Sequence, residues 1–113
     1  MTQGYKPPVS TFLTAADRED WYNKALAFMI VGVDTAPGKY GLAHTYKLAR
    51  VINDAGEVET RFISLSSNAR RADEAAWVTD TLAEDDSGIG PVKLEKVPTG
   101  NGFDAWIFAD CNA

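Results

Sequence analysis

Cysteine and histidine are scarce in this chain of 113 residues, which has one of each, Cys111 and His44. A single cysteine cannot form an internal disulfide, so the disulfide scaffold of small secreted domains is excluded and we expect an intracellular, cytoplasmic location. A single histidine cannot supply a multi-histidine zinc site. Cys111 and His44 could in principle form a nucleophilic pair, but Cys111 lies near the chain end without an obvious partner base. We therefore expect neither an enzyme nor a cofactor.

Long hydrophobic runs are also missing. A membrane-spanning helix needs roughly 18 or more apolar residues, and the longest candidate, 25–33, is too short and is typical of a buried strand. The first residues, MTQGYKPPV, lack the basic-then-apolar pattern of a secretory signal. With 45% apolar and 24% charged residues, the composition is that of an ordinary globular domain, and no membrane partner is expected.

The order of the expected elements is the most informative pattern that is present. Three strand-like runs come first, a helical run follows, and two more strand-like runs come last. Their ranges are 25–34, 44–53 and 57–65 for the first three strands, 68–84 for the helix, and 92–97 and 103–109 for the last two strands. This order is that of the OB-fold, a small, partly open Greek-key barrel of five strands that binds oligonucleotides or oligosaccharides on its second and third strands. We therefore predict an all-β barrel with one helix.

A single domain is expected at this length, preceded by an N-terminal addition. Residues 1–24 are predicted to form an arm with a short helix over 14–24, in which Thr14 is the N-cap and Asp17 lies near the capping-box position. Residues 25–113 are predicted to form the barrel.

Three local features add detail to the predicted barrel. Gly32 interrupts the first strand and indicates a bulge or a bend. The run 53–56 (NDAG) indicates a hairpin turn between the second and third strands. Trp77, on the central helix beside its apolar face, is predicted to plug one end of the barrel.

Charge is distributed unevenly along a chain whose net charge is −5. Residues 37–71 carry six basic and three acidic side chains, giving +3, whereas residues 72–113 carry two basic and nine acidic ones, giving −7. Such asymmetry can leave a basic face on an acidic protein. The basic part falls on the second and third strands, where an OB barrel binds its ligand.

Cations and aromatic rings gather on these strands and the loops nearby, which is the combination that single-stranded nucleic acid requires for phosphate contact and base stacking. Neither face of the second strand is cleanly polar, so the pattern leaves open which aromatic residues point outward. Arg70 and Arg71 oppose the dipole of the central helix, and either contact phosphate or form an ordinary surface pair. The candidate nucleic-acid-binding residues are Lys39, Tyr40, Tyr46, Lys47, Arg50, Arg61, Phe62, Lys96 and Phe103.

Three segments, FMIVGVDTAPGKYG, ETRFISLSSNARR and GPVKLEKVPTGNGFDAWIFAD, make the chain resemble small OB-fold single-stranded-DNA-binding proteins, in particular those of phages of actinobacteria. The resemblance spans about residues 25–110 and lies in apolar runs and turns rather than in a signature motif. It implies DNA binding in replication or recombination, within a phage-infected bacterial cell. The groove that it implies is lined by Lys39, Tyr40, Tyr46, Lys47, Arg50, Arg61 and Phe62.

The chain departs from the usual pattern of bacterial single-stranded-DNA-binding proteins in one way: it lacks a Gly- and Pro-rich extension with an acidic, phenylalanine-tipped end. The chain stops at 111–113 (CNA), so recruitment of repair partners through such a tail is not expected.

The sequence therefore predicts a non-enzymatic protein that binds single-stranded DNA with low sequence specificity, with RNA as an alternative ligand. A protein-interaction module of another class, such as a phage or host-takeover factor, would instead act through the acidic helix surface 73–86. A third interpretation is a structural subunit of an assembly, because the exposed edge strands of an open barrel favour a homo-oligomer.

Overall fold

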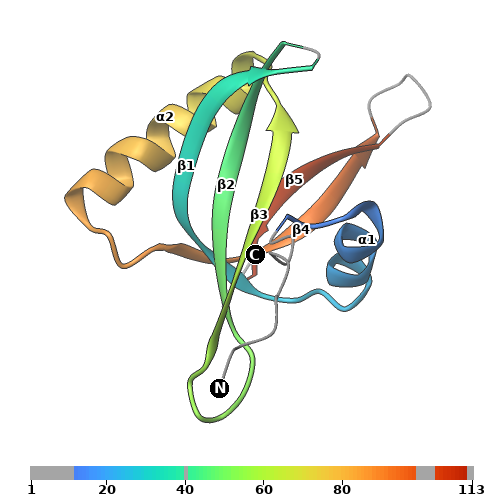
Figure 1. The fold of residues 1–113 in the computed structure, drawn as a ribbon, viewed down its shortest axis with the longest axis vertical. Helices are drawn as coiled ribbons and strands as arrows, with labels where there is room; N and C mark the ends of the chain where they lie inside the picture. Colours follow the sequence, from blue (N-terminus) through green and yellow to red (C-terminus); the bar gives the residue numbers. More distant parts are fainter. Residues whose placement is uncertain (1–11, 40, 99–103, 112–113) are drawn as a thin grey trace, which may run out of the picture.

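The computed structural model describes residues 12–39, 41–98 and 104–111, which form one antiparallel five-stranded sheet and two helices (Figure 1). The elements are α1 (Ala15–Asn23), β1 (Phe28–Gly38), β2 (Gly41–Val51), β3 (Val58–Ser66), α2 (Ala69–Glu84), β4 (Ile89–Pro98) and β5 (Asp104–Asp110). The mostly β character and the element order are those predicted. Strand order is β3-β2-β1-β4-β5, so within the described residues β3 and β5 are edges and the sheet is not closed. In the same part of the chain, neither helix has the length and apolar character that a membrane crossing requires.

The first strand extends beyond its predicted end. Residues 35–38 were expected to begin a loop, but they continue to pair with β2 as far as Gly38 opposite Gly41. Proline has no backbone N–H group to donate to a neighbouring strand. Pro37 is tolerated because β4 pairs with β1 only at Phe28 and Ile30, so β4 does not need a hydrogen bond from residue 37. The register shifts between Ile30 and Gly32, which confirms the predicted bulge.

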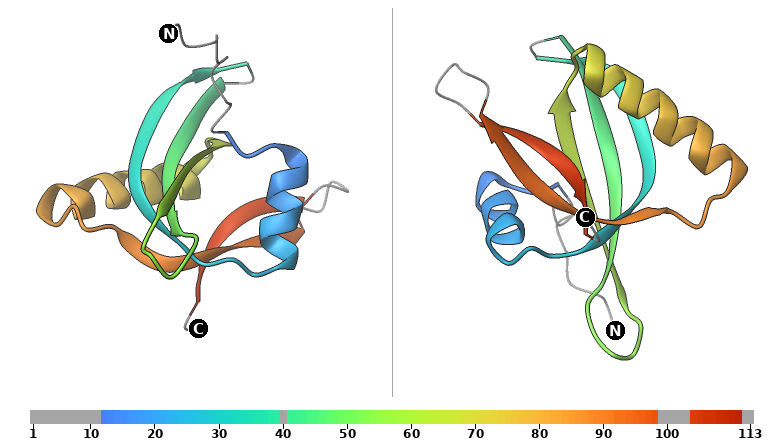
Figure 2. Two further views of the ribbon diagram at one scale, coloured as in Figure 1. Left: turned by 60° about the horizontal axis from the view of Figure 1, so that its bottom comes forward. Right: turned by 180° about the vertical axis from the view of Figure 1, so that it is seen from behind.

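The turn between β2 and β3 is also confirmed. The side-chain oxygen of Asn53 accepts hydrogen bonds from the backbone N–H groups of Ala55 and Glu57, and Gly56 adopts a φ of 83°. The β2–β3 hairpin projects beyond the rest of the molecule (Figures 1 and 2). The longest dimension of the molecule, hairpin included, is 55 Å.

The core lies between the inward face of the sheet and the two helices. Leu48, Ile63 and Leu94 are fully or almost fully buried there, and α2 adds Val78 while α1 adds Trp21. The Thr14 and Asp17 capping box begins α1, as predicted.

Trp77 does not plug the barrel end, and 56% of its surface is exposed. Ala75 and Val78 define the buried side of α2. Residues on a helix are separated by about 100°, so Trp77, one residue before Val78, points away from the core. The predicted role of Trp77 in the core is therefore wrong.

A buried polar network joins β2, α2 and β5. The hydroxyl of Tyr46 donates to Glu74 Oε1 at 2.9 Å, and Arg71 Nη1 donates to the same oxygen at 2.6 Å. The second guanidinium nitrogen of Arg71 donates to the carbonyl oxygen of Trp106 at 2.6 Å. Arg71 is 8% exposed, so it belongs to the core and neither predicted interpretation of it, phosphate contact or surface pair, is correct.

The substitution Tyr46→Phe should reduce the decline in the free energy of unfolding that occurs as the pH rises into the alkaline range. Burial, and then the Glu74 carboxylate, raise the pKa of the Tyr46 phenol above its usual range, so folding favours the protonated form. This contribution to the free energy of unfolding is complete below the unfolded-state pKa of about 10 and is lost as the pH rises above it. Urea unfolding between about pH 8 and 11 should therefore show a steeper decline for wild type than for Tyr46→Phe. Parallel declines would contradict this account.

Candidate functional site

The pleat of β2 decides which of its side chains can meet a ligand. Tyr46 and Leu48 have no exposed surface, whereas Lys47 is exposed on the other side of the strand. Successive strand residues point to opposite faces, so Lys47 and Ala49 lie on the side turned away from the core. We call this outward surface of β1, β2 and β3 the open face. The predicted ligand role of Tyr46 is wrong, because a fully buried ring cannot stack on a base.

A row of four residues crosses the open face from β1 to the sheet edge. Gly32 pairs with Lys47, Lys47 pairs with Phe62, and Phe12 forms a parallel bridge with Phe62 at the edge of β3. A Cβ atom added at Gly32 would lie 3.4 Å from Lys47 Cβ and 3.9 Å from Lys47 Cδ, so the lysine stem lies over the glycine. A larger residue at position 32 would crowd this stem.

The two rings of the row form an aromatic surface beside the lysine. The centroids of Phe12 and Phe62 are 5.6 Å apart, and their planes are inclined by 33°. Phe12 is 48% exposed. The same residues line a shallow hollow of about 470 Å³, with Asp34 and Thr45 at its other side. The open face thus offers exposed aromatic surface, one ammonium group and free space next to each other.

Arg61 holds the segment around Phe12 in place rather than facing a ligand. Its guanidinium is 2.9 Å from Glu59 Oε1 and 2.8 Å from Asp17 Oδ2, and it also donates to the backbone oxygen of Phe12 at 3.4 Å. The hydrogen bond from Arg61 holds the pKa of Glu59 below its usual range. Asp17 also has a lowered pKa, chiefly because the backbone N–H of Thr14 donates to it.

Arg50 and Lys96 are likewise engaged with carboxylates and rings of the protein. Arg50 is 2.9 Å from Glu59 Oε2, and its guanidinium lies over the Trp21 ring at 5.5 Å from the centroid. The Lys96 ammonium is 2.6 Å from Glu19 Oε1 and lies over the rings of Tyr22 and Trp106. These contacts connect α1 to β2 and to β4.

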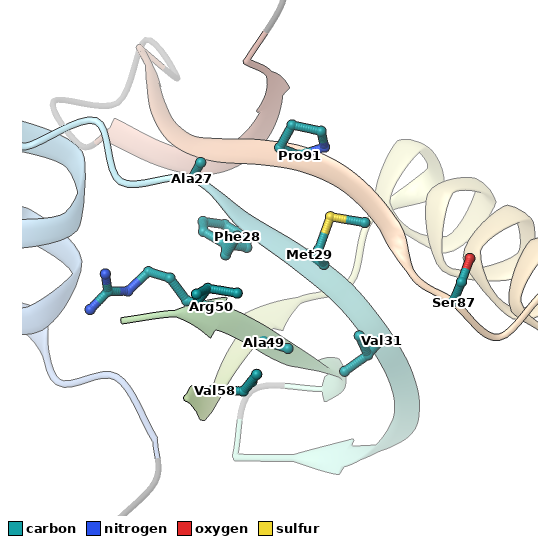
Figure 3. Close-up of a pocket in the computed structure, with 10 residues that line it drawn as sticks. Ala27, Phe28, Met29, Val31, Ala49, Arg50, Val58, Ser87 and Pro91 are labelled. Carbon is teal, nitrogen blue, oxygen red and sulfur yellow. The ribbon is translucent and has the colours of Figure 1, made fainter. Parts of the chain in front are cut away.

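A second hollow of about 400 Å³ continues the open face toward the β2–β3 hairpin. Figure 3 shows Met29, Val31, Ala49 and Val58 around it, while the Arg50 guanidinium points away toward α1. Its lining is almost entirely apolar, so it offers shape and contact surface without a fixed charge.

The structure thus brings together only part of the predicted site. Lys47 and Phe62 are neighbours on the open face, and Lys39 is exposed in the β1–β2 turn. Tyr40 and Phe103 lie outside the described residues. Phe12 was not among the candidates, and no local pattern could have placed it beside Phe62, because their contact is non-local. The remaining candidates, which point inward or are bound to carboxylates, are Tyr46, Arg50, Arg61 and Lys96.

His44 and Cys111 do not form a pair. The ring nitrogens of His44 lie 2.7 Å from Thr35 Oγ1 and 2.9 Å from Ser67 Oγ, and the residue is 4% exposed. Cys111 follows β5, where its backbone N–H donates to the carbonyl oxygen of Pro91. Among the described residues, no three His, Cys, Asp or Glu side chains are grouped so as to hold a metal ion.

Alanine substitutions at Arg61 and Lys47 should have different effects on the free energy of unfolding, because Arg61 has a structural role and Lys47 does not. Arg61→Ala should lower the free energy of unfolding by about 1.5–3 kcal/mol, because charged hydrogen bonds to Glu59 and Asp17 are lost. Lys47→Ala should change it by no more than about 0.5 kcal/mol, because the side chain is exposed. Urea unfolding monitored by circular dichroism measures both values. Similar losses of unfolding free energy for the two substitutions would show that Arg61 does not hold the segment around Phe12 in place.

Comparisons of the chain with protein families, with curated proteins and with solved structures find no match in any of the three. What the protein does is therefore inferred from the chemistry of its own surface.

Proposed function

We propose that the protein binds single-stranded DNA on the open face, with low sequence specificity and without catalysing a reaction. The observation that carries this proposal is the row of Gly32, Lys47, Phe62 and Phe12 across three strands. Nucleobases stack on aromatic faces, and an ammonium group attracts the phosphate between them. RNA, which has the same bases and phosphates, is the alternative ligand.

The arrangement of the strands supports an OB-type sheet. In an OB barrel the order β3-β2-β1-β4-β5 would close through contact between β3 and β5. Here one hollow is lined by Ser64 of β3 and by Trp106 of β5, so the two edges lie on either side of it. Arg18 donates to the carbonyl oxygen of Ser64 at 3.3 Å, and Arg71 donates to that of Trp106 at 2.6 Å. Arginines thus satisfy edge carbonyls at the place where strand pairing would close a barrel.

The placement of this surface agrees with the resemblance to small phage single-stranded-DNA-binding proteins, whose ligands lie along strands two and three. Phe62 and Lys47 occupy those strands, and Phe12 adds a ring at their edge. A protein that coats single strands during replication or recombination needs stacking surface more than base-specific hydrogen bonds, since every base has a π-face. The apolar hollow around Met29 and Val58 extends that surface.

Binding should depend only modestly on salt. Arg50, Arg61 and Lys96 are bound to carboxylates, which leaves Lys47 as the ammonium group at the centre of the described open face. Each cation that contacts a single strand contributes a slope of about −0.7 to log K against log salt. We expect a slope between about −0.7 and −1.4, corresponding to one or two phosphate contacts.

The test is titration of a fluorescein-labelled oligothymidine, followed by anisotropy, with three variants. Phe62→Ala should weaken binding by about 5- to 150-fold, which corresponds to one lost stacking contact of about 1–3 kcal/mol. Lys47→Glu should weaken binding and make the salt slope shallower by about 0.7. Lys24→Glu is the charge-matched control, because Lys24 lies at the end of α1 beside Asp20, and it should bind like wild type.

Two results would reject the proposal. One is unchanged affinity in Phe62→Ala, and the other is an equal loss in Lys24→Glu and Lys47→Glu, which would indicate only a general effect of net charge. Should Phe62→Ala fail to fold, Phe12→Ala provides the same test from a more exposed position.

A further inference from the structure

A second surface lies on α2 and has the opposite charge character. Trp77 is 56% exposed there, whereas Trp21 of the core is 4% exposed. Tryptophan is among the residues that most often carry the energy of protein–protein contacts. The exposed part of Trp77 is therefore a candidate for contact with another molecule.

A groove of about 270 Å³, lined in part by Trp77, lies between α2 and the first part of β4. Its walls are mostly apolar and include Val78 of the helix, Ile89 and Pro91 of β4, and Phe108 of β5. The groove is large enough to receive one apolar side chain of another molecule, and such a side chain would contact Trp77.

Exposed carboxylates lie near Trp77 on the solvent side of α2, and their placement is unfavourable for the helix itself. Asp73, Asp80 and Glu84 are exposed and lie four residues before, three after and seven after Trp77, on or near the same side of α2. Asp80 and Glu84 also lie toward the helix C-terminus, where negative charge opposes the dipole. Within the described residues none of these three forms an ion pair. Glu74 and Asp110 add two further carboxylates to the lining.

We propose that this surface binds a segment of a partner protein in which lysine or arginine residues flank one apolar side chain. The apolar side chain enters the groove beside Trp77, and the cations contact Asp73, Asp80 and Glu84. Charge complementarity selects this occupant, because carboxylates repel the phosphates of a nucleic acid. The surface uses none of the residues of the open face, so the inference does not depend on DNA binding.

The probe is a short synthetic peptide in which lysines and arginines flank a single leucine, titrated into the ¹⁵N-labelled protein. The indole N–H signals of Trp77, Trp21 and Trp106 report three separate places in one spectrum. We expect the Trp77 signal to shift saturably while the Trp21 signal stays in place. A peptide with glutamates in place of the cations should cause no shift. A Trp77 signal that stays in place, or that shifts equally with both peptides, would overturn the proposal.

Two kinds of variant sharpen the test. Trp77→Ala should weaken peptide binding at least about tenfold and leave oligothymidine binding unchanged. Glu84→Gln should weaken peptide binding, whereas Glu57→Gln, which removes the same charge from the exposed β2–β3 turn, should not. Equal effects of the two charge substitutions would reject the specific site. A Trp77 signal that moves on dilution of the protein alone would also reject it, in favour of a second copy of this chain as the occupant.

Discussion

The register in which β2 pairs with its two neighbours determines which side chains of the sheet enter the core and which face outward. Lys47 lies opposite Gly32 on one side and Phe62 on the other, while Tyr46 lies opposite Val33 and Ile63. A slip of one residue would turn Tyr46 and Leu48 outward and bring Lys47 into the core. The hydrogen bond from Tyr46 to Glu74 opposes such a slip, because the slip would leave the partly buried Glu74 carboxylate without its phenol partner. The core and the open face are thus two consequences of one pairing.

The arginines that the sequence pattern assigns to a ligand are instead paired with carboxylates of the protein itself. Arg50 and Arg61 share Glu59, and Arg61 also reaches Asp17, so α1 is fastened to the sheet. Arg71 belongs to the buried network of Tyr46 and Glu74. The two surfaces that remain differ in kind: the open face has aromatic rings and a lysine, and the α2 surface has an exposed tryptophan among carboxylates. The open face therefore suits an anionic ligand, and the α2 surface suits a cationic one.

The order of the elements, the N-cap of α1 at Thr14, the bulge at Gly32 and the turn at 53–56 follow from local patterns, and the sequence is enough to predict them. The candidate site is harder to predict, because alternation alone does not say which face of a strand is buried. Tyr46 and Phe62 look equally suited to stacking in the sequence, and only the position of α2 decides that Tyr46 is core. The pairings of Arg61 with Asp17 and of Lys96 with Glu19 join residues 44 and 77 positions apart, which no local pattern reveals.

Photo-crosslinking to oligothymidine would show where on the protein a single strand binds. The complex would be irradiated, digested with a protease and analysed by mass spectrometry to locate the thymidine adduct. We expect adducts on Phe62 or Phe12, and we expect them to be lost when an excess of a competing single strand is added. Adducts located on α2 around Trp77, with none on the open face, would contradict the proposed binding on the open face.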